Sequence, residues 1–199
     1  MKTIAILSLV SMMSLVSMAD AAIYTLQPSP SPDGDLWDLS HYNYYAWKIT
    51  ANQFNPASDE IITGASLFFD NIENWDSESN TLYVSLLSGS DLSFADEVFT
   101  GNDNQSGGDS VLAQFDGVPL VTFNNLPASP QDLIYNFNPA DIVMLNAYAA
   151  DGVFGIGFDP DCRYWNDGIS LTIQTIPEPT TVLLLGLGGL GFLSRRRSA

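Results

Sequence analysis

Cysteine, histidine and basic residues are scarce in this chain of 199 residues. Cys162 is the only cysteine, which excludes an intramolecular disulfide and leaves either a buried thiol or pairing with another chain. His41 is the only histidine, and the sequence lacks a nucleophile elbow, a zinc-protease helix motif and a glycine-rich phosphate loop. We therefore expect a protein that is not an enzyme, because no residue constellation that a reaction needs is present.

The shortage of basic residues is sharpest in the middle of the chain. Between Ala22 and Ile176 only Lys48 and Arg163 are basic, whereas 21 residues are acidic, a net charge of −19. Such a segment is repelled by nucleic acid phosphates and by anionic lipid head groups, so we expect no nucleic acid partner. The charge either keeps an exported domain soluble or attracts hard divalent cations. Hydrophobic residues make up 46% of the chain, enough for a core.

The N-terminal segment has the layout of a secretory signal peptide. Lys2 gives a positive start, residues 4–16 are mostly apolar, and small residues follow at Ala19 and Ala21. We predict that residues 1–21 form a signal helix that signal peptidase removes after Ala21, or alternatively after Ala19. The segment is short for a transmembrane helix, which needs about 20 apolar residues.

The C-terminal segment has three parts in a fixed order. Pro177, Glu178 and Pro179 come first, residues 180–193 form an apolar run, and a basic cluster of Arg195, Arg196 and Arg197 follows. The prolines keep the peptide around Glu178 extended. The apolar run can enter a bilayer as a helix, and the arginines then stop transfer on the cytoplasmic side. A run of this length suits a transient hold in the inner membrane, with an ordinary single-pass anchor as the alternative.

This order of parts resembles the PEP-CTERM sorting domain of Gram-negative bacteria. The resemblance covers about a tenth of the chain, within residues 177–199. It implies recognition by an exosortase, a membrane-embedded cysteine transpeptidase, with cleavage near Pro177–Pro179. It also implies export through the inner membrane, a cell-surface or extracellular location after tail removal, and an organism that makes exopolysaccharide and often forms biofilm. It says nothing about residues 22–176.

Residues 22–176 carry the pattern of one β domain. Short segments rich in β-branched and aromatic residues alternate with Gly, Asn, Asp and Pro turns, at residues 61–70, 81–88, 118–123, 133–137, 153–158 and 169–173. This pattern predicts an all-β fold, a single antiparallel β-sandwich that is jelly-roll-like. The order of its segments is similar to that of carbohydrate-binding-module-like jelly rolls.

One short late helix is expected within this domain. Asn138 is a good N-cap, Pro139 suits the first helical position, and Gly152 can end the segment. The complete precursor would thus have a signal helix before the sandwich and a transmembrane-like helix after it.

Two sets of residues are candidates for ligand binding. Oxygen ligands gather between two predicted strands at Asp159, Asp161, Asn166 and Asp167, and calcium takes about six to eight such oxygens. The alternative is that these side chains cap turns by bonding to their own backbone. A run of aromatic residues, namely Trp37, Tyr42, Tyr44 and Trp47, either lines a sugar-binding face or packs in the core.

Two functions fit these observations. The first is a non-enzymatic protein of the cell surface or extracellular matrix, processed by an exosortase and linked to exopolysaccharide or biofilm. The second is a calcium-dependent carbohydrate-binding or adhesion module. Catalysis by a pair of carboxylates has no specific support, because so many acidic residues offer pairs without indicating any one of them.

Overall fold

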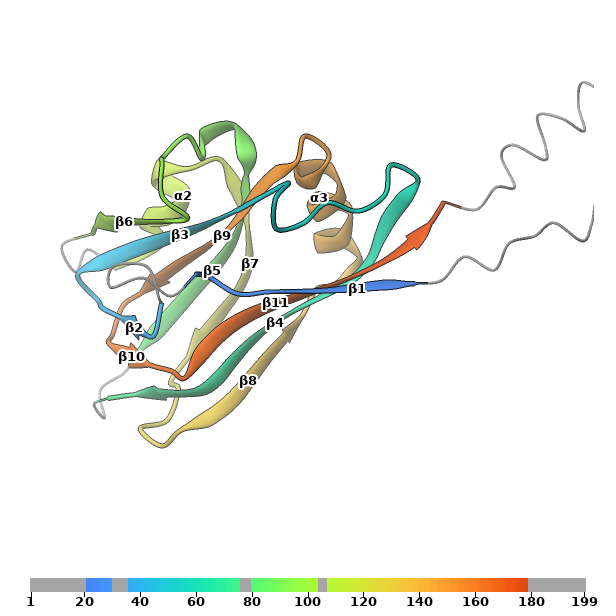
Figure 1. Ribbon diagram of the computed structural model, residues 1–199. Helices are drawn as coiled ribbons and strands as arrows, with labels where there is room; N and C mark the ends of the chain where they lie inside the picture. The colour runs from blue at the N-terminus through green and yellow to red at the C-terminus, as the bar shows by residue number, and fades with distance from the viewer. Residues whose placement is uncertain (1–20, 30–35, 76–79, 104–106, 179–199) are drawn as a thin grey trace, which may run out of the picture.

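The computed structural model describes residues 21–29, 36–75, 80–103 and 107–178, and it confirms a mostly β fold with two antiparallel sheets (Figure 1). The six-stranded sheet has the order β1-β11-β4-β10-β2, and β8 also pairs with β4. Its strands are β1 (Ala22–Leu26), β2 (Asp38–Leu39), β4 (Glu60–Asn74), β8 (Gln131–Asn136), β10 (Tyr164–Trp165) and β11 (Gly168–Pro177).

The five-stranded sheet has the order β6-β3-β9-β5-β7. Its strands are β3 (Asn43–Thr50), β5 (Thr81–Ser88), β6 (Val98–Asn102), β7 (Gly117–Asn124) and β9 (Val153–Pro160). Five of the six predicted strand segments lie within observed strands, and the sixth, residues 133–137, overlaps β8 in all but its last residue; β1, β2, β3, β6 and β10 lie outside the predicted segments. Of these, β2 and β10 have two residues each, too few for any alternation of apolar and polar residues to show in the sequence.

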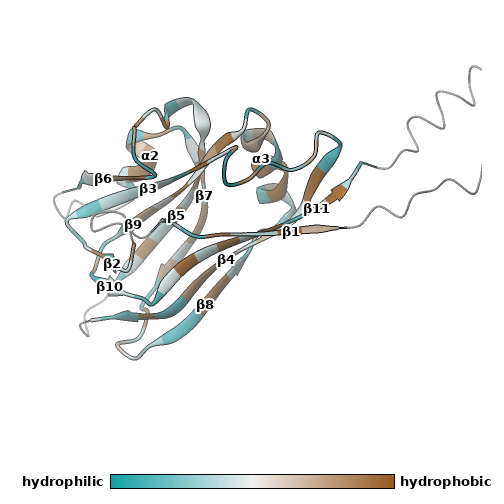
Figure 2. Cartoon of the chain, viewed as in Figure 1, coloured by the Kyte–Doolittle hydropathy of each residue, from teal (hydrophilic) through white to brown (hydrophobic). Residues whose placement is uncertain are grey.

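The main core lies between the two sheets and follows from alternation along the strands. In β4 the buried side chains include Leu67, Phe69 and Ile72. Phe68 points away from the core, and an irregularity between Phe69 and Ile72 shifts the alternation by one residue. Hydrophobic residues recur along the strands in the same way in Figure 2. Burial of these side chains from both sheets supplies the main driving force for packing them together.

A second, smaller core covers the other face of the five-stranded sheet. It contains Tyr44, Ala46, Leu87, Leu92, Val111 and Phe115. Gly155 and Gly157 of β9 make room for it, because a Cβ on Gly157 would lie 2.4 Å from a methyl carbon of Val111. The central strands β3 and β9 are therefore buried on both faces, and their aromatic and aliphatic side chains serve packing on either side.

The late helix is confirmed as α3 (Pro139–Ala149). Asn138 is its N-cap and accepts hydrogen bonds from the amides of Ala140 and Asp141, while the Asp141 side chain bonds back to the Asn138 amide. Gly152, with φ of 84°, adopts the left-handed conformation just after the helix. The structure adds a short helix, α2 (Ser110–Gln114), capped by Asp109, and a single 3-10 turn at Gly89–Asp91.

The two ends of the sandwich domain leave it side by side. Strands β1 and β11 are paired, with Ala22 opposite Thr175 (Figure 1). The predicted signal helix of residues 1–21 lies outside the described residues apart from its last residue. Pro179, the transmembrane-like helix and Arg195–Arg197 also lie outside them. Among the residues that are described, no helix is both long and apolar enough to cross a bilayer.

Candidate functional site

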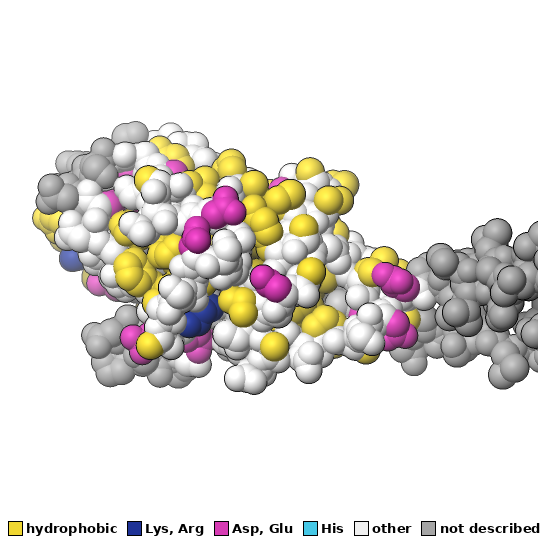
Figure 3. All heavy atoms as spheres, turned by 90° about the horizontal axis from the view of Figure 1, so that it is seen from above, with side chains coloured by type: hydrophobic (Ala, Val, Ile, Leu, Met, Phe, Trp, Pro, Cys, Tyr) yellow, Lys and Arg dark blue, Asp and Glu magenta, His cyan; other side chains and the backbone are white. Residues whose placement is uncertain are grey.

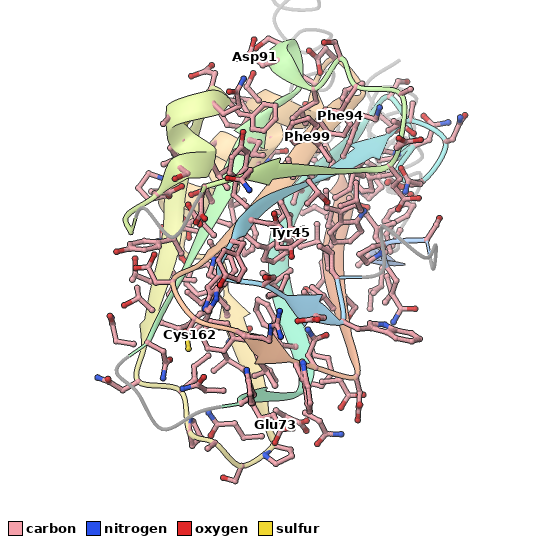
Figure 4. The ribbon with its side chains drawn as sticks, turned by 90° about the vertical axis from the view of Figure 1, so that its left-hand side faces the viewer. Tyr45, Glu73, Asp91, Phe94, Phe99 and Cys162 are labelled. Atoms are coloured by element: carbon pink, nitrogen blue, oxygen red, sulfur yellow. The ribbon has the colours of Figure 1, made fainter. Side chains whose placement is uncertain are left out.

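A corner of the six-stranded sheet, where β10 lies between β2 and β4, presents two tryptophans to solvent. Tyr164 is paired with Leu39 on one side and Asn74 on the other, and these three side chains are buried. Because side chains alternate along a strand, the next residue, Trp165, projects to the opposite, solvent-facing side. Its cross-strand partners there are Asp38 and Glu73. Glu73 marks this corner in Figure 4.

The rings of Trp75 and Trp165 lie parallel on this outer side. Their planes differ by 7° and their centroids are 6.3 Å apart. The two side chains are 54% and 49% exposed, so each keeps about half of its surface in water. The Trp75 amide donates a 3.2 Å hydrogen bond to the Arg163 carbonyl oxygen, which holds the end of β4 against the segment leading into β10. We call Trp75 and Trp165 the tryptophan pair.

Charged groups flank the tryptophan pair. Arg163 Nε lies 3.7 Å from Asp38 Oδ1, and Glu73 is opposite Trp165 in the strand register. Flat apolar rings beside charged hydrogen-bonding groups form a surface that can stack on the apolar face of a sugar and bond to its hydroxyls.

The buried side of the same corner is held by polar side chains. The Tyr164 hydroxyl donates a 2.8 Å hydrogen bond to Asn80 Oδ1, which also accepts from the Leu126 amide at 2.9 Å. Asn80 Nδ2 donates to the Leu126 carbonyl oxygen at 3.1 Å. The Cys162 thiol is buried and bonds to Asn74 Oδ1 at 3.2 Å (Figure 4), in keeping with the buried-thiol alternative. These bonds fix the backbone on which the tryptophan pair stands.

The predicted aromatic run is divided by the fold, which corrects half of that prediction. Trp37 and Tyr42 are about half exposed. The Trp37 carbonyl oxygen accepts from the Asn166 amide at 3.0 Å, so Trp37 borders the corner. Tyr44 is buried in the smaller core beside Phe99 and Phe115, and Trp47 is fully buried with its Nε1 donating to Glu97. Tyr44 and Trp47 thus have no ring face to offer a sugar, because both faces of β3 are covered.

Sequence reasoning missed Trp75 and Trp165. Each stands alone in the sequence, the first beside a turn and the second in a two-residue strand, so no aromatic run indicated them. One feature of the sequence could have indicated them: each tryptophan directly follows a residue whose side chain is buried in the structure, Asn74 or Tyr164. Because side chains alternate along a strand, the tryptophan then points to solvent.

The fold divides the four predicted calcium ligands into two pairs, because Asp159 and Asp161 lie at the end of β9 and Asn166 and Asp167 lie before β11. Asp159 lies in β9, opposite Tyr83 of the five-stranded sheet, whereas Asp167 precedes β11 of the other sheet and accepts from Asn71 Nδ2 at 2.8 Å. Asn166 Oδ1 accepts from the Gly168 amide at 2.9 Å, which is turn chemistry, and Asn166 Nδ2 donates to the carbonyl oxygen of the distant Leu36 at 2.8 Å. Within the described ranges, no group of three or more His, Cys, Asp and Glu side chains is arranged to hold a metal ion.

Asp159 instead lies among other acidic residues. Its side chain is fully buried, and its Oδ2 accepts a short hydrogen bond from the Ser110 amide. Asp109 caps α2 by accepting from the Leu112 amide at 3.0 Å, and it also accepts from Ser85 Oγ at 2.9 Å. Burial, together with Asp103 and Asp109, raises the pKa of Asp159 to about 7 despite the hydrogen bond from Ser110.

A cleft of about 320 Å³ lies elsewhere, between the end of β3 and the segment before β6. Polar side chains dominate its lining, among them Lys48, Asn52, Gln53 and Glu97. Lys48 Nζ already donates to the Phe94 carbonyl oxygen and lies 4.6 Å from the centre of the Phe94 ring. Glu97 accepts from Trp47 Nε1 and from the Ser29 amide. Because Lys48 and Glu97 have partners within the protein, the cleft is a weaker candidate than the tryptophan pair.

The first two residues of the Pro-Glu-Pro segment belong to the end of the sheet. Pro177 is opposite Glu60 in the β11–β4 register, and the Glu178 amide donates to the Asp59 carbonyl oxygen at 2.5 Å. The Glu178 side chain is exposed. The folded domain therefore runs directly into this segment without an intervening linker.

Comparison with protein families shows a PEP-CTERM protein-sorting motif at residues 175–197. The chain is thus a mostly β protein that carries a PEP-CTERM sorting motif. The motif indicates an exported protein that an exosortase processes and that has a cell-surface or extracellular location. Among curated proteins no match was found.

Solved structures resemble the fold only distantly. A carbohydrate-binding module from the glycoside hydrolase family 9 enzyme Cel9A of Ruminococcus flavefaciens FD-1 shares 15% identity with a TM-score of 0.33, over 76% of this chain and 97% of that one. Desmodium yellow mottle tymovirus shares 11% identity with a TM-score of 0.34, over 83% of this chain and 91% of that one. A latent aurone synthase shares 11% identity with a TM-score of 0.36 over 72% of this chain, which spans about a quarter (26%) of that enzyme.

Proposed function

We propose that this exported protein is a non-enzymatic binding protein that holds neutral polysaccharide at the cell surface or in the extracellular matrix. The tryptophan pair is the observation that carries the proposal. Single exposed apolar side chains are ordinary, but two half-exposed indole rings lying parallel on the outer side of this corner form a larger apolar surface than folding requires. The two rings are stacked on each other and each is about half exposed, so the exposed part of each ring can pack against the apolar face of a sugar.

The negative charge of the domain favours uncharged polysaccharides over anionic ones. Residues 22–176 carry a net charge of −19, and acidic side chains are spread over the surface in Figure 3, where basic ones are few. A polymer rich in uronate or sulfate would be repelled by this field. Arg163, the basic residue at the corner, is already paired with Asp38. The ligand class that fits is therefore an uncharged glycan whose hydroxyls bond to Asp38, Glu73 and Arg163.

Binding rather than catalysis fits the shape of the site. The tryptophan pair and its charged neighbours stand on the outer side of strands rather than in an enclosed space. An open face can retain a polymer, but it does not exclude water or hold a scissile bond against a positioned acid and base. The sorting motif supports the same role, because it indicates a cell-surface or extracellular location, where a polysaccharide would be within reach of the domain.

The test is retention of the secreted protein on polysaccharides. We expect the protein to be retarded in gels that contain a neutral glucan or xylan and not in gels that contain a polyuronate. Trp75→Ala and Trp165→Ala should each weaken retention by about tenfold, since aromatic residues dominate such contacts. Val143→Ala, which changes an exposed residue of α3, is the control and should bind as the unmodified protein does. Equal retention of both tryptophan variants and the unmodified protein would contradict the proposal.

A further inference from the structure

The last residues of β11 lie inside the six-stranded sheet, at the end where the Pro-Glu-Pro segment begins. β11 runs between β1 and β4, so it pairs with a strand on either side. Thr175 is opposite Ala22 of β1 and Ile62 of β4. β1 and β11 leave the domain side by side at this end (Figure 1). The start of the sorting motif at residues 175–197 is therefore part of the folded sheet.

One carboxylate ties the three strands together at this end. Glu60 Oε2 accepts a 2.7 Å hydrogen bond from the Thr175 hydroxyl and a 3.4 Å hydrogen bond from the Tyr24 hydroxyl. Glu60 belongs to β4, Thr175 to β11 and Tyr24 to β1. Thr175 is fully buried, so loss of its acceptor would leave a buried hydroxyl unpaired. We call Tyr24, Glu60 and Thr175 the strand-end clamp.

Backbone contacts hold the same end of the sheet. The Asn146 side chain of α3 accepts from the Ile62 amide and donates to the Ile62 carbonyl oxygen, each at 2.9 Å. One residue beyond β11, the Glu178 amide donates to the Asp59 carbonyl oxygen at 2.5 Å. The backbone at the start of the Pro-Glu-Pro segment is thus held against β4, although the Glu178 side chain is exposed.

A paired strand end is a poor substrate for a cleaving enzyme. The peptide to be cut must enter the enzyme's active site, and a segment within a sheet does so only in molecules where it has opened locally. The domain meets the Pro-Glu-Pro segment without a linker, so residues that leave the sheet supply the reach. At about 3.3 Å per residue, freeing residues 175–178 supplies about 13 Å.

We propose that the strand-end clamp gates processing: the exosortase engages the Pro-Glu-Pro segment only after residues 175–178 separate from β1 and β4. The clamp sets the fraction of precursor whose strand end is open, and this fraction sets the rate of cleavage when opening and closing are fast. A carboxylate acceptor suits this role, because hydrogen bonds to a charged group are stronger than neutral ones. The gate is independent of polysaccharide binding, since the tryptophan pair lies at the opposite end of β4.

The rate at which the full-length precursor becomes the processed protein tests the gate. The precursor is made in a bacterium that carries the exosortase, pulse-labelled, and followed by gel electrophoresis, with mass spectrometry of the product. Glu60→Ala removes the acceptor of both hydroxyls and leaves residues 175–197 unaltered, so conversion should be about tenfold faster. Tyr24→Phe removes only the longer bond and should speed conversion about twofold. Equal rates for Glu60→Ala and the unmodified protein would overturn the proposal.

Asn80→Ala is the control for a general loss of stability. Asn80 accepts from the Tyr164 hydroxyl, and Tyr164 is opposite Asn74 at the other end of β4. This variant should lower the melting temperature more than Glu60→Ala does, yet be processed at nearly the rate of the unmodified protein. If Asn80→Ala sped conversion as much as Glu60→Ala, cleavage would follow global unfolding, and a local gate would be wrong.

A reversible crosslink tests the closed state. Ile61 of β4 is opposite Ile176 of β11, so the double variant Ile61→Cys, Ile176→Cys places two thiols across the strand end. The purified, oxidised precursor should be cleaved by exosortase-containing membranes at least about tenfold more slowly than the same protein after reduction and removal of the reductant. Comparison of one protein in two states cancels any effect of Ile176→Cys on recognition of the motif. Equal cleavage of the two states would show that the enzyme acts on the paired strand end, which contradicts the gate.

Discussion

The two sides of the corner formed by β2, β10 and β4 reverse the usual distribution of polar and apolar residues. The buried side holds Asn74, Asn80 and the hydroxyl of Tyr164, whereas the solvent side holds Trp75 and Trp165. The same few residues of backbone carry both sides, since alternate side chains point in opposite directions. Two departures from normal burial are informative: an exposed apolar surface and buried polar groups. This corner shows both.

The contrast between the two sides of the corner shows which one serves the fold and which is free for a ligand. Each buried polar group meets a named partner, so the inner side is built to hold one backbone geometry. The outer tryptophans contribute less to the stability of the fold than fully buried tryptophans would, because about half of each side chain is exposed. The backbone geometry of the inner side holds them in place. Substitutions on the two sides should therefore separate stability from binding.

The largest expected effect comes from Asn80→Ala on the inner side. It removes the acceptor of the Tyr164 hydroxyl and both bonds to the Leu126 backbone, which leaves buried polar groups unpaired. We expect a loss of about 3 kcal/mol in the free energy of unfolding, measured by urea denaturation. Asn136→Ala, at an exposed position of β8, is the control, and a similar loss in both variants would show that the inner network has no special role.

A smaller loss is expected from Tyr164→Phe. This substitution removes one hydroxyl and leaves the Leu126 amide still bonded to Asn80. The free energy of unfolding should fall by about 1.5 kcal/mol, about half the cost of Asn80→Ala. Urea denaturation of the two single variants and the double variant would measure their coupling, and strictly additive losses would contradict a shared network.

On the outer side, Trp165→Ala should cost about 1 kcal/mol of stability, because the side chain is already half exposed. The same variant should lose most of its retention on neutral polysaccharide. Urea denaturation and retention in polysaccharide gels, measured on the same sample of Trp165→Ala, compare its loss of stability with its loss of binding directly. A loss of stability as large as that of Asn80→Ala would mean that the tryptophan pair belongs to the core and that its binding role is unsupported.

The smallest effect is expected from Asp38→Asn. Asp38 and Arg163 form a partly exposed ion pair at 3.7 Å, and such pairs contribute little because water and salt screen them. The free energy of unfolding should change by less than about 0.5 kcal/mol, with little difference between 0.1 M and 0.5 M salt in urea denaturation. A larger change would show that the pair positions the tryptophans rather than merely flanking them.

Local patterns in the sequence predicted much of the fold. Alternation located β4, β5, β7, β8, β9 and β11, since a half-buried strand must place apolar residues on one side. Asn138, Pro139 and Gly152 located α3, since capping and the left-handed turn depend on neighbouring residues only. The Pro-Glu-Pro segment, apolar run and arginines identified the sorting motif, because their order lies within one short stretch.

The grouping of residues around these sites escaped prediction because it joins distant segments. Asn166 bonds to Leu36 across 130 residues of sequence, and Cys162 bonds to Asn74 across 88. Asp103 reaches Asp159 only because β3 places β6 and β9 in one sheet. The aromatic run from Trp37 to Trp47 was misjudged in part for a related reason, since the smaller core that covers Tyr44 is formed by residues far from it in sequence.

Neighbouring residues alone specify six of the strands, the capped helix, the acidic charge and the sorting motif, because each of these depends on local identity and spacing. Which tryptophans face solvent and which carboxylates are buried depends instead on tertiary packing. Exposure is a property of what packs against a side chain, and the residues that bury Trp47 and Asp159, or leave Trp75 and Trp165 in water, are brought there by the pairing of strands distant in the chain.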